Sequence, residues 1–135
     1  MPHLAMGTAI YNTLSTNSAL TTELGGTLIY NGQAPQDPGD KFVVFNWAGG
    51  GDENLTPHRT RNVVYTVQAV ATTWNDAATV DRLIDAALHE QTLTVSGWTN
   101  FWTAREDDIN YIEQDAGGNP IFHVGAQYRI RIDDD

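Results

Sequence analysis

The closing part of the sequence carries the pattern that most constrains the fold, a long stretch in which apolar and polar side chains alternate. Between residues 120 and 132 one set of alternate positions is apolar: Phe122, Val124, Ala126, Tyr128, Ile130 and Ile132. The other set is mostly polar: Ile121, His123, Gly125, Gln127, Arg129 and Arg131. Because successive side chains of a strand point to opposite faces, the pattern predicts a strand with one buried face and one polar face. Residues 61–72 repeat it, with Val63, Tyr65, Val67, Ala69 and Ala71 on one face.

The clearest helical periodicity lies between residues 75 and 90. Its apolar stripe consists of Ala77, Val80, Leu83, Ile84, Ala87 and Leu88. Thr73 and Asp76 stand three residues apart before this stripe, as in a capping box, which predicts where the helix begins. A stripe of this width is typical of a helix that packs one side on a sheet and leaves the other in water.

Weaker signals complete the chain. Residues 4–15 predict a helix with Leu4, Ile10, Tyr11 and Leu14 on one side, and Asn17 caps a short second helix that ends at Gly25. Further strands are predicted at 28–30, 41–48, 92–97, 100–106 and 109–114, with a hairpin turn at 115–120. Residues 49–60 are expected to form a long mobile loop, and Glu106, Asp107 and Asp108 a solvated turn between strands.

The order of elements predicts an α+β fold with a mostly antiparallel sheet. One long helix and an N-terminal helix are expected to pack on one face of this sheet. No linker or internal repeat divides the chain, so a single domain over residues 1–135 is expected.

Composition excludes several classes of function. The chain has no cysteine, which excludes disulfides and zinc-thiolate sites. It has 7 Lys and Arg against 17 Asp and Glu, a net charge of −10, so we expect no sequence-specific nucleic-acid binding and no docking on anionic lipid. The first residues lack a basic, apolar leader and no stretch approaches 18 apolar residues, so neither a signal peptide nor a membrane span is expected.

Motifs for catalysis are missing from the sequence. Gly49-Gly50-Gly51-Asp52 lacks the Lys and the Ser or Thr of a phosphate-binding loop, and there is no Gly-x-Ser-x-Gly elbow. The histidines (His3, His58, His89 and His123) are not spaced as paired metal ligands. We therefore expect no enzyme, no cofactor and no metal. The four tryptophans (Trp47, Trp74, Trp98 and Trp102) favour core and interface packing, with a small ligand-binding module as the alternative.

The motifs and their order resemble the tail-completion, or tail-terminator, proteins of long-tailed bacteriophages and prophages. The resemblance rests on the helix that ends in Leu88-His89 and on the closing strand with Tyr128-Arg129-Ile130-Arg131, preceded in order by Leu28-Ile29-Tyr30, Phe42-Val43-Val44-Phe45 and residues 63–69. It implies a mixed α/β subunit, made in the host bacterial cytoplasm, that forms a hexameric ring at the capsid-proximal end of the virion tail. The implied partners are further copies of the chain, the tail tube protein and a head-completion or neck protein. A neck or head-completion connector is the alternative.

The candidate interface residues come from the few cations and histidines. Arg129 and Arg131 share the polar face of the closing strand, and His123, His58 and Arg59 complete the candidate subunit or tube interface. Two explanations of the arginine pair stay open. They form surface ion pairs within the chain, worth about 0–1 kcal/mol each, or they meet carboxylates of an adjacent subunit or of the tube protein.

Overall fold

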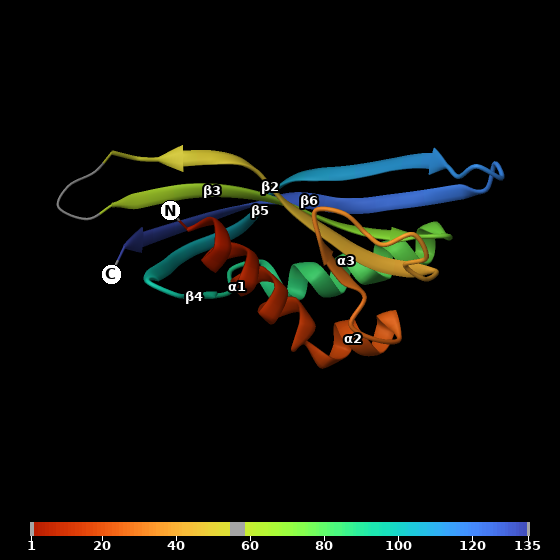
Figure 1. Cartoon of the computed structure of the whole chain (residues 1–135), viewed down its shortest axis with the longest axis horizontal. Coiled ribbons are helices and arrows are strands. Elements are labelled where there is room, and N and C mark those ends of the chain that lie inside the picture. The colour runs from red at the N-terminus through yellow and green to blue at the C-terminus, as the bar shows by residue number, and fades with distance from the viewer. Residues whose placement is uncertain (1, 55–58, 135) are drawn as a thin grey trace.

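A computed structural model of the chain describes residues 2–54 and 59–134. It begins with two helices, α1 (His3–Ser15) and α2 (Ser18–Leu24). A short strand β1 (Ile29–Asn31) and two long strands β2 (Lys41–Asp52) and β3 (Thr60–Ala71) follow. After the third helix α3 (Trp74–Leu88), the chain ends in β4 (Thr94–Val95), β5 (Trp98–Gln114) and β6 (Pro120–Asp134). Figure 1 shows the helices together on one side of a curled sheet.

The strands of the described residues form one sheet in the order β1-β2-β3-β6-β5-β4. β1 runs parallel to β2, and the other neighbours pair antiparallel. Two long hairpins, β2–β3 and β5–β6, project toward opposite ends of the molecule beyond the helices (Figure 1). The sheet therefore has one face covered by helices and one face open.

The core lies between the helices and the covered face. Both predicted alternations are confirmed there: Val63, Tyr65, Val67, Ala69, Ala126, Tyr128, Ile130 and Ile132 are buried. The predicted stripe of α3 meets them through Val80, Ile84 and Leu88. Burying a large apolar side chain stabilises the fold by about 1.5–3 kcal/mol, so these faces fix the register of the sheet.

Local caps set the helix boundaries as predicted. The Asn17 side chain accepts a hydrogen bond from the Leu20 N–H at 3.0 Å, and Thr73 accepts one from the Asp76 N–H at 3.2 Å. Gly25 ends α2 in the left-handed conformation with φ of 79°, where a side chain would be strained.

Several expectations were wrong. Leu4 and Tyr11 are exposed rather than part of the core, because α1 buries Met6, Ala9, Ile10 and Leu14 instead. Residues 49–52 are not loop but continue β2, and Thr60 already belongs to β3; residues 55–58 lie outside the described part of the chain.

The acidic run Glu106-Asp107-Asp108 does not form a turn between strands. It lies inside one continuous strand, β5, where the register shifts between Arg105 and Asp108. A bulge accommodates the extra residue without ending the pairing with β6. The predicted strand at 92–97 is reduced to Thr94–Val95.

The mixed α/β content is thus as predicted, although α1 is nearly as long as α3, with 13 residues against 15, so the sheet does not carry a single long helix. Within the described residues no helix is both long and apolar enough to cross a bilayer.

Candidate functional site

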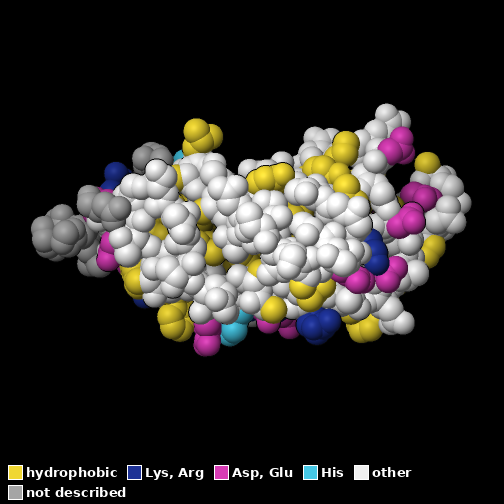
Figure 2. All heavy atoms as spheres, turned by 90° about the horizontal axis from the view of Figure 1, so that it is seen from below, with side chains coloured by type: hydrophobic (Ala, Val, Ile, Leu, Met, Phe, Trp, Pro, Cys, Tyr) yellow, Lys and Arg dark blue, Asp and Glu magenta, His cyan; other side chains and the backbone are white. Residues whose placement is uncertain are grey.

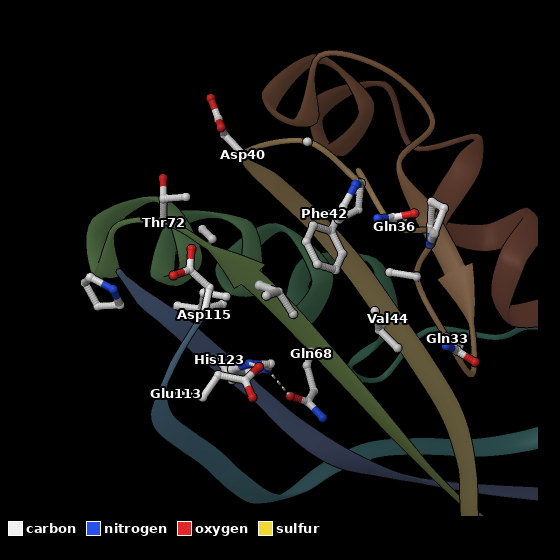
Figure 3. Close-up of a pocket in the computed structure, with 18 of the residues that line it drawn as sticks. Gln33, Gln36, Asp40, Phe42, Val44, Gln68, Thr72, Glu113, Asp115 and His123 are labelled. Atoms are coloured by element: carbon white, nitrogen blue, oxygen red, sulfur yellow. Dashed lines mark hydrogen bonds and ion pairs between the residues drawn. The ribbon is translucent and has the colours of Figure 1, made fainter. Parts of the chain in front are cut away.

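The open face of the sheet is hollowed into a groove of about 900 Å³ (Figure 3). Apolar side chains of β2, β3 and β6 form its floor: Phe42, Val44, Val70 and Ile121. Residues 32–40 line one rim, and the β5–β6 hairpin lines the other with Tyr111, Glu113 and Asp115. Its lining includes the acids Asp40, Glu113 and Asp115 and the histidine His123, and none of the lining residues that the structure describes is Lys or Arg.

His123 lies at the centre of a polar cluster in this groove. Its Nδ1 lies 3.1 Å from Gln68 Oε1 and its Nε2 lies 2.6 Å from Glu113 Oε1 (Figure 3). Its ring stacks on Tyr111, with the ring centroids 4.3 Å apart. The alternation in the sequence predicts His123 on the polar face of the closing strand, as an exposed or interface residue. His123 does lie on that face, but its side chain is only 12% exposed.

Asp115 holds the turn of the β5–β6 hairpin. Its carboxylate accepts hydrogen bonds from the backbone N–H groups of Gly117 and Asn119, each at 2.9 Å. The Asn119 backbone bond and the other donors of the turn hold the pKa of this carboxyl below its usual value of 3.8.

We expect the Asp115 carboxyl to titrate below pH 3.8, and the turn to loosen only as the pH falls through that lower midpoint. The sign follows from the lowered pKa, because the charged form is the one that the turn amides bind. NMR titration of the side-chain carboxyl carbon, followed with the amide shifts of Gly117 and Asn119, measures it. In Asp115→Asn those two amide shifts should no longer follow this titration. A midpoint at or above 3.8 in the parent would contradict the assignment.

Arg129 and Arg131 share the open face of β6, as predicted, and both contact acids of their own chain. Arg129 Nε donates to Glu106 Oε2 at 2.7 Å, which raises the pKa of the guanidinium. Arg131 Nη2 donates to both Glu53 oxygens, at 2.8 and 2.9 Å, and its guanidinium lies 5.3 Å from the centroid of the Phe101 ring. The side chains are 33% and 38% exposed, so both remain accessible to a partner.

Arg59 directly precedes β3, at the loop end of the β2–β3 hairpin, and lies beside Asp134 at the other end of β6 from His123. Its Nε donates to Asp52 and its backbone N–H donates to Asp134 at 2.7 Å. His58 falls outside the described residues. The candidate interface residues therefore do not form one cluster: Arg59, Arg129 and Arg131 lie toward one end of the sheet, and His123 lies toward the other.

A side-chain network under the helices was missed from the sequence. Arg105 turns to the covered face and donates to Asp81 Oδ1 and Oδ2, both at 3.0 Å, to Tyr128 Oη at 3.2 Å and to the Gly125 carbonyl at 3.1 Å. The available signal was Asp81 and Asp85, four residues apart on α3 beside its apolar stripe. Two acids at the edge of a buried face require a cation.

The tryptophans do not line the groove, so they do not support a ligand site there. Trp47 and Trp98 pack against the core, whereas Trp74 and Trp102 are about half exposed. No group of three or more metal-ligating side chains occurs in the part of the chain that the structure describes. Figure 2 shows the helix-covered side, where hydrophobic side chains lie in small separate groups and acidic side chains gather near one end.

Comparisons with known proteins identify the fold and the family of the chain. A chain of a solved structure titled "Virion of native gene transfer agent (GTA) particle" has the same fold, with a TM-score of 0.76 at 14% sequence identity. The match covers 93% of this chain and 92% of that chain. No curated protein matches the sequence. The model of the family described as tail completion protein gp17 matches residues 8–133. The chain therefore belongs to the tail completion protein gp17 family, and it is a structural protein of the bacteriophage virion tail.

Proposed function

We propose that the chain assembles into a hexameric ring that terminates the tail tube and offers the surface to which the head is joined. The family match over residues 8–133 carries this proposal. In this reading the whole chain, residues 1–135, acts as one domain, and its partners are further copies of itself, the tail tube protein and a head-completion or neck protein.

The open face of the sheet supports assembly. It presents apolar floor residues and the half-exposed aromatic side chains of Phe101 and Trp102 to solvent. Exposed apolar patches beside polar residues are typical of protein interaction sites. The net charge of −10 per subunit favours passage of DNA through a ring, because binding to the phosphate backbone requires clustered cations.

Native mass spectrometry of the purified protein, alone and with tail tubes, tests the proposal. A six-subunit species and tubes that stop growing when the protein is added are expected. A protein that stays monomeric in both experiments, or tubes that keep growing, would contradict it.

Arg129 and Arg131 are proposed as contacts to an adjacent subunit or to the tube. Replacing both by Gln should weaken ring formation or capping about tenfold, and more at low salt, because charge-assisted pairs at an interface are screened by salt. The monomer should stay folded, because each partly exposed pair contributes only about 0–1 kcal/mol. Sedimentation of the variant at two salt concentrations, with thermal unfolding, measures both effects.

Arg82→Gln is the matched control, since Arg82 is an exposed cation on α3, on the other side of the sheet. If the double variant assembled and capped tubes like the Arg82 variant, both arginines would be ordinary surface residues.

A further inference from the structure

The edge of β2 that faces away from β3 is only partly covered. β1 pairs with it at Val43, Val44 and Phe45, and the Gly32 N–H closes this pairing with the Phe45 carbonyl at 2.7 Å. Beyond that point no strand of the described residues pairs with this edge over residues 46–52. An unpaired edge of this kind is a template for another strand.

The edge of β5 that faces away from β6 is also covered only at its start. The Glu90 N–H donates to the Thr103 carbonyl at 2.8 Å, and the Arg105 N–H donates to His89 Nδ1 at 3.1 Å. From residue 106 to 114 this edge has no strand partner among the described residues. The molecule thus has two different free edges, on opposite margins of one sheet.

We infer that the free edge of β5 in one copy pairs antiparallel with the free edge of β2 in the next copy, with Ile112 placed beside Trp47. The inference rests on the proposed ring and states how its subunits join. Two different edges that meet head to tail form a heterologous interface, which closes into a ring when the rotation between copies allows it.

Strand direction agrees with this pairing. β2, β3, β6 and β5 are joined by three successive antiparallel pairings, so β5 runs opposite to β2 in one copy. In copies related by rotation about an axis that runs roughly along the strands, corresponding strands keep the same direction. The β5 of one copy therefore meets the β2 of the next antiparallel.

The apolar side chains along the two edges also favour this pairing. Ile112 is 61% exposed and pairs with Phe122 on the covered side of the sheet. Trp47 pairs with Tyr65 on that same side. A second hollow, lined by α1 residues that include the 87% exposed Leu4 and on the sheet side by Asn31 and Phe45, lies next to the start of this edge. An incoming Ile112 would lie beside the Trp47 ring, whose centroid is 4.1 Å from that of His3 on α1. The helices of both copies then lie on one side of the joined sheet.

The charged side chains at the other end of the pairing do not oppose it. Beyond the bulge between Trp47 and Gly49, the register that keeps like faces together places Tyr111 beside Gly49 and Asp108 beside Asp52. Glu106 and Asp107 then approach Arg59, whose side chain is 50% exposed. Asp108 and Asp52 are both acidic, but each is already paired with a cation of its own chain, Arg105 and Arg59 respectively, so this register brings no unpaired like charges together. The exposed acidic run disfavours pairing with other acidic edges by repulsion.

The offset between the two edges fits a closed sheet. Within one copy, Ile112 pairs with Phe122, Phe122 with Ala71, and Ala71 with Lys41. Ile112 therefore lies at the same height in the sheet as Lys41, which is six residues from Trp47 along β2. Pairing Ile112 with Trp47 of the next copy therefore requires a shift of six residues, about 20 Å, along the strand direction. This shift accumulates across the four strands β2, β3, β6 and β5, which together are about 19 Å wide. The resulting strand tilt of about 45° lies at the upper end of the range found in closed barrels.

A disulfide cross-link tests the pairing in the full chain, which has no cysteine of its own. The variant Gly49→Cys with Tyr111→Cys is expected to give covalent oligomers on oxidation. An added Cβ at Gly49 meets nothing within 4 Å, so the site tolerates the change. In one copy these positions are separated by three strand spacings, about 14 Å, and by a further shift along the strands, which together are beyond the reach of a disulfide.

The matched control is Gly49→Cys with Glu113→Cys, which moves the second thiol about 7 Å along the same face of β5. An oligomer that forms no 49–111 cross-link, or that cross-links equally in the control, would overturn the edge pairing and leave the ring intact. A cross-linked species whose subunit number is not six would overturn the proposed ring and keep the pairing. A protein that neither assembles nor cross-links would overturn both.

A second variant tests the apolar contact. Ile112→Lys is expected to weaken self-association about tenfold with an unchanged melting temperature, because the side chain is exposed in the monomer. Trp74→Lys is the control, since Trp74 is exposed to a similar degree but lies on α3. Equal association of the two variants would count against the pairing.

Discussion

Replacing Gly125 by Ala is expected to destabilise the protein by about 3 kcal/mol, the upper end for inserting a methyl group into a packed site. A Cβ at this position would lie 2.6 Å from Gln68 Cα and closer still to the Val67 carbonyl oxygen. These are backbone atoms of β3, the strand that pairs with β6, and they cannot move away without breaking the pairing. Urea unfolding followed by circular dichroism measures the loss.

Gly49→Ala is the matched control, a strand glycine where an added Cβ meets nothing within 4 Å. We expect it to change stability by less than about 0.5 kcal/mol, as at other open surface sites. Equal midpoints for the two variants would mean that β3 and β6 can separate at Gly125 at little cost, and the close approach would have no structural role.

The close approach at Gly125 has a consequence for the groove. β6 passes near β3 at this point, and one to three residues further along β6, opposite residues 126–128, β5 carries the bulge between Arg105 and Asp108. Bulges increase the local twist of a strand pair. Beyond it the β5–β6 hairpin projects past the helices (Figure 1) and forms a wall of the groove.

Sequence patterns predicted the parts of the fold in which one periodicity runs uninterrupted. Residues 120–132 and 61–72 alternate without a break, and the helix at 75–90 has a complete stripe, so each had one face that could be buried. The caps at Asn17 and Thr73 were predicted for a similar reason, because their hydrogen bonds involve only residues three positions away.

The errors have a common physical origin in contacts between distant segments. Glu106, Asp107 and Asp108 have turn-forming composition, and only the pairing with β6 keeps them extended. Gly49, Gly50 and Gly51 indicated a loop, but pairing with residues 62–64 makes them strand. The groove could not be predicted, because its walls come from segments about 80 residues apart in sequence.

The acids that pair with Arg129 and Arg131 could not be predicted either, because they too come from distant segments. That Arg129 and Arg131 share a face followed from their spacing of two. Their partners Glu106 and Glu53 come from β5 and from the residue that directly follows β2, and the abundance of acids in the chain left that choice open.

Arg105→Ala is expected to destabilise the protein by about 2–4 kcal/mol, near the range for breaking a buried ion pair. The Arg105 side chain is 20% exposed and that of Asp81 is 13% exposed, so the substitution would leave the Asp81 carboxylate largely desolvated without its cation. It would also remove the donors to Tyr128 Oη and to the Gly125 carbonyl. Because this guanidinium joins α3 to β5 and β6, the unfolding midpoint in urea should fall clearly.

Further variants at Arg105 and Asp81 distinguish the contribution of the Arg105 hydrogen bonds to stability from the contribution of its charge. Arg105→Lys keeps the cation but cannot reach both Asp81 oxygens and Tyr128 at once, so we expect it to lose roughly half as much stability as the Ala variant. Arg105→Met combined with Asp81→Leu removes both charges and fills the space, and it should recover most of the loss, since an apolar replacement avoids the unpaired buried carboxylate. If the double variant were as unstable as Arg105→Ala, the cost would come from the lost contacts to Tyr128 and Gly125. The bulge in β5 would then depend on the hydrogen bonds of Arg105 rather than on its charge.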